Sequence, residues 1–185
     1  MSRRATSPNV TALVLAWLVG ATGAARAQAP GALASFTATT VVDNTALTIG
    51  QLNGLDFGVV TPGAPSTIGP KTALAGKFVL HGVKNAEVQI TFSLPSVLQA
   101  GTRTMPISFA DDPVAGKMGC HRNQDQQANC TAYTPASALI AKIRNNAPPQ
   151  NTYYVWIGGK VSPAAGQQPG TYTGVVTLSA IYTGN

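Results

Sequence analysis

Alternation of apolar and polar side chains at a spacing of two residues dominates this chain. Residues 87–94 alternate cleanly, and the C-terminal stretch 170–182 does so almost throughout. Successive side chains on a strand point to opposite faces, so both stretches predict half-buried antiparallel strands. The side chains predicted to face the core are Val88, Ile90, Phe92, Leu94, Tyr172, Val176, Leu178, Ala180 and Tyr182.

Shorter runs rich in β-branched or alternating residues predict further strands. They cover residues 36–42, 47–49, 55–60, 77–81, 105–109 and 153–159. Leu55, Phe57 and Val59 are predicted to share one face. We expect Phe57, Phe92 and Val176 to be buried, because each is in phase with apolar neighbours.

Two segments lack a clear alternation. Residues 111–135 are predicted to form a long loop, and 136–144 fit a short helix or an irregular strand equally well. Frequent Gly and Pro between many short strands, without a convincing helix, predict an all-β antiparallel sandwich. No repeat of fixed period indicates a propeller or a solenoid.

The N-terminus has the pattern of a secretory signal. Arg3 and Arg4 precede an apolar run of about ten residues, which is too short to span a bilayer. Ala25-Arg26-Ala27 then matches an A-x-A cleavage site. We therefore predict a signal peptide over residues 1–27 and one exported domain over residues 28–185, with no membrane span after cleavage.

Charge and composition exclude some functions. Residues 1–27 hold Arg3, Arg4 and Arg26 and no acidic residue, so half of the formal charge of +6 leaves with the signal. The remaining Lys and Arg are scattered, without a basic run interleaved with aromatics. The sequence therefore predicts no nucleic-acid partner.

The two cysteines, Cys120 and Cys130, lie in the exported part of the chain. Disulfides are the default in an oxidising compartment, so we predict that this pair closes a polar surface loop. A metal site using these thiols with His121 and Asp125 does not match a zinc spacing. A calcium site on Asp111, Asp112 and Asp125 lacks the EF-hand spacing. We predict no cofactor and no metal.

Catalytic residues are not evident. Catalysis needs converging acid–base groups or an activated nucleophile, whereas His81 is predicted on a solvated strand face and His121 inside the cysteine loop. We predict that the protein is not an enzyme. Tyr153, Tyr154 and Trp156 offer a different possibility, an exposed aromatic platform for a carbohydrate, although a core role is more common for such residues.

Two motifs carry a family resemblance. Residues 55–63 (LDFGVVTPG) resemble the LDFG-x-(I/V)-x-PG opening of a family of bacterial exported domains of unknown function. Residues 158–161 (GGKV) and 167–174 (QQPGTYTG) resemble the ending of that family, and the layout is similar to spore-coat-U-type and archaic chaperone–usher pilins. The cysteine that some pilin relatives carry after the first strand is absent, since Asp43-Asn44 stands there.

The resemblance implies an immunoglobulin-like sandwich that lacks an edge strand, filled by a strand from another chain through β-augmentation. Residues 28–42 fit such a donor, because they are uncharged, begin with Pro and Gly, and then alternate. The residues predicted to insert are Phe36, Ala38, Thr40 and Val42. The alternative is that residues 36–42 form the first strand of a complete sandwich.

The sequence thus predicts an exported structural subunit of a fimbrium or similar surface assembly. Implied partners are further copies or other pilus subunits, a periplasmic chaperone that covers the open edge, and an outer-membrane usher. The predicted location is the periplasm, the cell surface or the extracellular space. The alternative function is a self-complete secreted binding domain for a carbohydrate or another surface ligand.

Overall fold

A computed structural model describes residues 46–144 and 150–184 as an all-β protein. Antiparallel strands form three sheets, and within the described residues the one helical element is the 3₁₀ turn η1 (Gln127–Asn129). The predicted signal peptide, the extension 28–42 and its insertion candidates Phe36, Ala38, Thr40 and Val42 lie outside the described residues.

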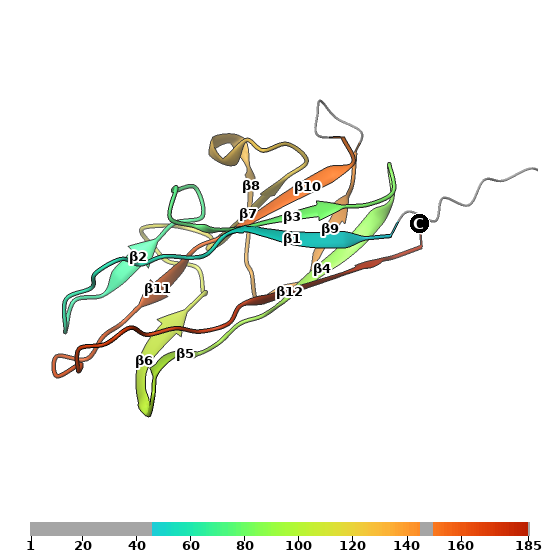
Figure 1. Cartoon of the computed structure of the whole chain (residues 1–185). Helices are drawn as coiled ribbons and strands as arrows, with labels where there is room; N and C mark the ends of the chain where they lie inside the picture. Colours follow the sequence, from blue (N-terminus) through green and yellow to red (C-terminus); the bar gives the residue numbers. More distant parts are fainter. Residues whose placement is uncertain (1–45, 145–149, 185) are drawn as a thin grey trace, which may run out of the picture. The chain divides into compact units, whose positions relative to one another are not determined.

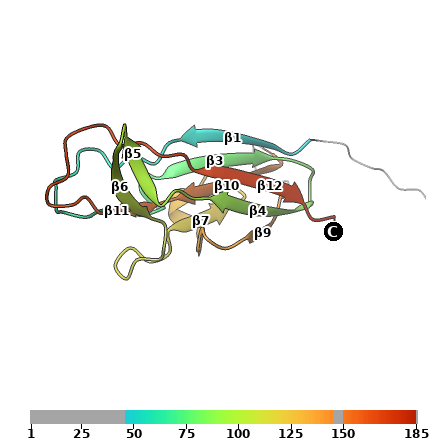
Figure 2. The same ribbon diagram turned by 90° about the horizontal axis from the view of Figure 1, so that it is seen from below.

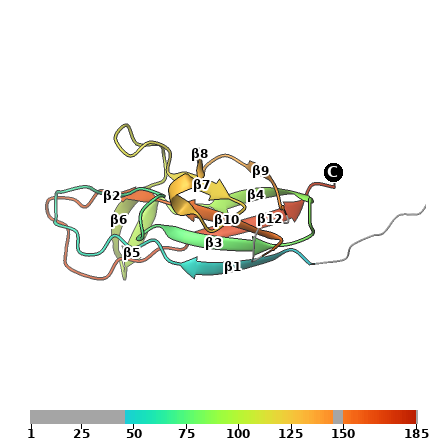
Figure 3. The ribbon, with the colours of Figure 1, turned by 90° about the horizontal axis from the view of Figure 1, so that it is seen from above.

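The largest sheet has five strands in the order β1-β3-β10-β7-β8. Their bounds are β1 Thr48–Asn53, β3 Gly76–His81, β10 Thr152–Ile157, β7 Gly119–Arg122 and β8 Thr131–Tyr133. Figure 3 shows β1 and β8 at opposite edges of this sheet, with β10 near its centre. All six residues of β10 are buried, as expected of a central strand covered on both faces.

Two smaller sheets complete the architecture (Figure 1). One has the order β12-β4-β9, with bounds Thr177–Tyr182, Glu87–Ser93 and Leu139–Lys142. The other has the order β2-β11-β6-β5, with bounds Ser66–Ile68, Gly159–Val161, Arg103–Ser108 and Val97–Ala100. The chain passes from β10 directly into β11 at Gly158. One continuous segment therefore joins the five-stranded sheet to the four-stranded sheet β2-β11-β6-β5.

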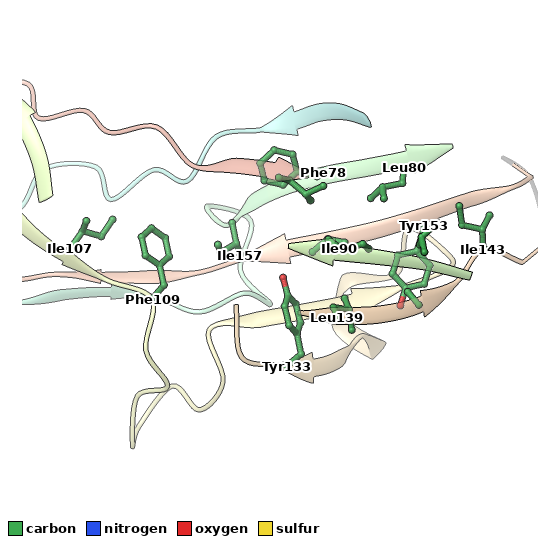
Figure 4. Close-up of a cluster of buried hydrophobic side chains, with 14 of the residues drawn as sticks. Phe78, Leu80, Ile90, Ile107, Phe109, Tyr133, Leu139, Ile143, Tyr153 and Ile157 are labelled. Atoms are coloured by element: carbon green, nitrogen blue, oxygen red, sulfur yellow. The ribbon is translucent and has the colours of Figure 1, made fainter. Parts of the chain in front are cut away.

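The main hydrophobic core joins side chains from all three sheets. Figure 4 shows Phe78, Leu80, Tyr153 and Ile157 of the five-stranded sheet lying close to Ile90 of β4. β4 follows the predicted alternation, with Val88 and Ile90 fully buried and Leu178 of β12 in phase beside them. Other core residues are Leu98, Met105, Ile107, Phe109, Tyr133, Leu139, Ala141, Ile143, Val155 and Val161.

The predicted strand 55–60 is wrong, because this segment is irregular. The Asp56 Oδ1 atom accepts a hydrogen bond from the Gly58 amide at 2.8 Å, and Gly58 has a φ of +61°. This turn breaks the alternation. Leu55 and Phe57 still pack against the core, but Val59 is fully exposed rather than on their face.

Three further predictions need correction or completion. The predicted loop 111–135 contains β7 and β8, and the undecided segment 136–144 forms β9. The predicted C-terminal strand begins only at Thr177, and Thr173 instead pairs with Gln99 of β5. Phe57, Phe92 and Val176 are partly rather than fully buried, although all three pack against the core.

The predicted disulfide between Cys120 and Cys130 is present in the structure, with the two Cα atoms 5.5 Å apart. It belongs to a second, smaller core on the outer face of the five-stranded sheet, together with Val79, Tyr154 and Trp156. The two cysteines pack with these aromatic rings, while the residues between them are exposed or partly exposed, as predicted for a surface loop.

His121 lies inside this disulfide loop, as predicted, but on β7 and packed between two tyrosines. Its ring stacks on Tyr153, with centroids 5.7 Å apart, and meets the edge of Tyr133 at 5.6 Å. The Tyr153 hydroxyl is hydrogen-bonded to His121 Nδ1. Burial lowers the pKa of His121 below its ordinary value of 6.5 and raises that of Tyr153, so a neutral imidazole faces a protonated phenol.

This arrangement predicts a loss of stability in mild acid. Between about pH 7 and pH 5 the unfolded chain binds more protons at His121 than the folded chain does. The free energy of unfolding therefore decreases as the pH is lowered through this range. Denaturant melts across this range should show the fall, and His121→Gln should flatten it. His81→Gln, at an exposed position on β3, is the matched control for the removal of a histidine. Equal slopes for wild type and His121→Gln would contradict the prediction.

Candidate functional site: an open apolar groove

A depression in the described part of the chain lies between two irregular segments. Its volume is about 1200 Å³, and its two walls are drawn from residues 51–60 and 167–176. We call it the β1–β12 groove, because one wall continues β1 and the other precedes β12. Core side chains form its floor: Phe78, Leu98, Met105, Ile107, Phe109 and Ile157.

The two walls of the groove continue from strands at the edges of two different sheets. β1 is the edge of the five-stranded sheet, β12 is the edge of the three-stranded sheet, and among the described residues no strand pairs with the outer side of either. The two strands run in opposite directions in Figure 2. Unpaired edges present free N–H and C=O groups that can accept a further strand.

Side chains around this opening are less buried than those on the rest of the core. The partly buried apolar residues packed against the main core all come from residues 47–60, 92–94 and 172–182. Val59 and Val175, which line the groove, are exposed at 103% and 78%. Accessible apolar side chains therefore lie on both walls of the groove.

The first wall is held by the LDFG and PG residues. The Asp56 amide donates to the Leu74 carbonyl at 3.0 Å, while the Asp56 side chain caps Gly58. Gly63 has a φ of +76° and its amide donates to the Ala164 carbonyl at 3.0 Å. Glycine is the residue that adopts such positive φ values without strain. Gly58 and Gly63 therefore allow the backbone turns that shape this wall.

The second wall is held by the Q-x-x-G-x-Y residues. Gln167 Nε2 donates to the Tyr172 hydroxyl at 2.6 Å and to the Thr104 carbonyl at 3.1 Å. The Tyr172 hydroxyl in turn donates to the Gln168 carbonyl at 2.8 Å. Arg103 donates to the Pro169 carbonyl at 2.6 Å. These bonds attach the wall to the β5–β6 hairpin.

The Gly-Gly pair lies where the chain crosses between sheets. A Cβ atom on Gly158 would lie 2.2 Å from the Ile68 carbonyl oxygen, so only glycine fits there. A Cβ on Gly159 would approach Leu55 and Phe57, two apolar residues of the first wall. Each motif singled out in the sequence therefore shapes the groove or its support.

The groove is almost free of charge. Of the described residues that line it, Asp56 alone is charged, and its carboxylate accepts the Gly58 amide. The Tyr172 hydroxyl is engaged with Gln167 and Gln168. An occupant of this groove would meet apolar side chains, backbone groups and neutral polar side chains such as Gln51 and Asn53, so an uncharged extended segment fits its chemistry.

The other candidate site residues do not converge. Asp111 accepts from Thr134, Asp112 pairs with Lys160 at 3.1 Å, and Asp125 pairs with Lys77 at 2.7 Å. Backbone amides of Ala115 and Val114, and then Lys160, lower the pKa of Asp112. Within the described residues no three His, Cys, Asp or Glu side chains gather as metal ligands would.

The aromatic platform predicted as an alternative is not exposed. Tyr153, Tyr154 and Trp156 are all buried, because both faces of β10 are covered. Lys77 lies over the rings of Tyr154 and Trp156, at 5.4 and 5.9 Å from their centroids. His81 is exposed on β3, as predicted.

Sequence reasoning missed Leu98 in the groove floor and the irregular course of both walls. The signal for Leu98 was the run 97–100 ahead of a Gly-Thr turn and the alternating 103–108, which together form the β5–β6 hairpin.

No described helix has the length and apolarity needed to cross a bilayer. Comparison with known proteins gave no match to a family model, a curated protein or a solved structure.

Proposed function

We propose that this protein is an exported structural subunit, pilin-like, that assembles into a fimbrium or a similar surface polymer by β-strand donation. The observation that carries the proposal is the β1–β12 groove, an opening with a single charged lining residue between a wall that continues the edge strand β1 and a wall that precedes the edge strand β12. In this proposal the fold is an immunoglobulin-like sandwich that lacks one edge strand, as the resemblance to the pilin-like family implies.

The proposed occupant is the segment 28–42 of a second copy. Its alternating residues Phe36, Ala38, Thr40 and Val42 would insert their side chains above the groove floor. In β-augmentation the main-chain hydrogen bonds give affinity and alternate side chains fill pockets. The segment carries no charge, and the lining offers one carboxylate that is already capped.

Export, a periplasmic chaperone and an outer-membrane usher belong to the same proposal. An open apolar groove with two free edges favours aggregation, so a chaperone would cover it until a donor strand arrives. The signal-like residues 1–27 and the Cys120–Cys130 bond support an oxidising compartment.

Size-exclusion chromatography of the exported chain with and without residues 28–42 tests the proposal. We expect the longer chain to form multimers and the shorter chain to remain a monomer. Adding a synthetic peptide of residues 28–42 to the shorter chain should raise its melting temperature, because a ligand that binds only the folded state stabilises it. Multimers of the shorter chain would contradict strand donation.

Photo-crosslinking distinguishes donation between chains from completion within one chain. A photoreactive side chain at Val175, on the groove wall, should link to residues 34–42, whereas one at Val114 should not, although it is 95% exposed. Mixing chains labelled with ¹⁴N and ¹⁵N identifies links between copies by mass. Links confined to one isotope would instead support the self-complete alternative.

A further inference from the structure

A second depression, of about 360 Å³, lies on different elements and has the opposite chemistry to the groove. Arg122, Asn123 and Gln124 at the end of β7 line it together with Lys142 and Arg144 at the end of β9. We call it the β7–β9 basic pocket. Its three cations are one third of the Lys and Arg in the exported part, and none of its lining residues is acidic.

The carboxylates on the elements next to the pocket do not neutralise its three cations. Glu87 is opposite Lys142 in the β4–β9 register, but its Oε1 atom accepts from the Thr183 hydroxyl at 2.8 Å and it forms no ion pair with Lys142. Asp125 is paired with Lys77 at 2.7 Å. The side chains of Lys142 and Arg144 make no hydrogen bond or ion pair within the described residues.

Arg122 supplies an independent indication of a missing acceptor. One terminal nitrogen of its guanidinium donates to the Asn129 carbonyl, which fixes the side chain. Its Nε atom is buried and has no acceptor among the described residues. A buried donor on a charged group is costly to leave unpaired, and a guanidinium binds oxyanions in a fixed, forked geometry.

We propose that the β7–β9 basic pocket binds a doubly charged oxyanion, a phosphate or a sulfate group. Arg122 would donate from its rigid guanidinium, Lys142 and Arg144 would supply the remaining charge, and the Gln124 amide would offer a neutral donor. The group can be a free ion or an ester on a sugar, because both present the same oxygens. The pocket does not share lining residues with the groove, so the proposal is independent of strand donation.

Titration of the ¹⁵N-labelled exported chain with sodium phosphate, at constant ionic strength, tests the pocket directly. The Arg122 Nε–H resonance should shift and saturate. The double variant Lys142→Gln with Arg144→Gln should weaken phosphate binding at least about tenfold, as expected when charge-assisted hydrogen bonds are lost. Lys117→Gln removes one cation outside the pocket and is the matched control, expected to leave binding unchanged.

A second titration with glucose 6-phosphate identifies the source of the anion. Binding at least about tenfold tighter than inorganic phosphate indicates a sugar ester, whereas equal affinity indicates the free ion, and both outcomes support the pocket. The proposal is overturned if the double variant binds phosphate as well as wild type does. It is also overturned if the resonance moves equally with chloride and does not saturate, which indicates general ionic screening.

Discussion

Phe36→Asp is expected to abolish multimers while leaving a soluble monomer when a chaperone is present. In the proposed assembly Phe36 inserts into the groove of a neighbour, whose floor is apolar and offers no cation. Burying an unpaired carboxylate there costs several kcal/mol, and a loss of about 4 kcal/mol weakens association by about a thousandfold. Analytical ultracentrifugation of the exported chain measures the effect.

The alternation of the segment supplies the control for this experiment. Thr37 is adjacent and points to the opposite face of an inserted strand, so Thr37→Asp should keep a solvated carboxylate and assemble nearly normally. A self-complete sandwich predicts a different result, because Phe36→Asp would then unfold the monomer itself. Normal multimers of Phe36→Asp would refute donation through this face.

Ile90→Ala is expected to have the largest effect on stability. Ile90 is fully buried in the core, in register with Leu139 of β9 and Ala180 of β12. Truncating a buried Ile to Ala costs about 2–5 kcal/mol, which is a large part of the stability of an ordinary domain. Chemical denaturation followed by circular dichroism gives the difference in unfolding free energy.

Ile140→Ala is the matched control, because it makes the same chemical change on the adjacent strand. Ile140 is 53% exposed on the outer face of β9. Its truncation should change the unfolding free energy by no more than about 0.5 kcal/mol. Similar losses for the two variants would contradict the assignment of the two faces.

Alternation was sufficient to predict the strands that are half buried. Val88 and Ile90 were assigned to the core from sequence because β4 has one wet and one dry face, and both are fully buried. The same rule failed for Val59, where the turn at Asp56 and Gly58 interrupts the strand. Trp156 could not be assigned to one face, because β10 is central and buried on both.

Alternation along the chain did not predict the walls of the groove. These walls depend on contacts between distant segments, such as Gln167 with Thr104 and Gly63 with Ala164, which leave no periodic signal in the chain. The cysteine segment was predicted as a loop because it is mostly polar and its two short strands, β7 and β8, show no clear alternation of apolar and polar residues. β7 is a strand because it pairs with β10 and β8. These partners are brought together only by the folded structure, so the sequence of β7 alone does not indicate them.

The position of β1 has a mechanical consequence for the proposed polymer. β1 follows the N-terminal segment, so tension transmitted through a donated segment reaches the body of each subunit first at β1. Its antiparallel ladder with β3 runs from Thr48 opposite His81 to Asn53 opposite Lys77. The ladder hydrogen bonds are perpendicular to the strands, so a pull along β1 loads them together in shear, whereas peeling would break them one after another.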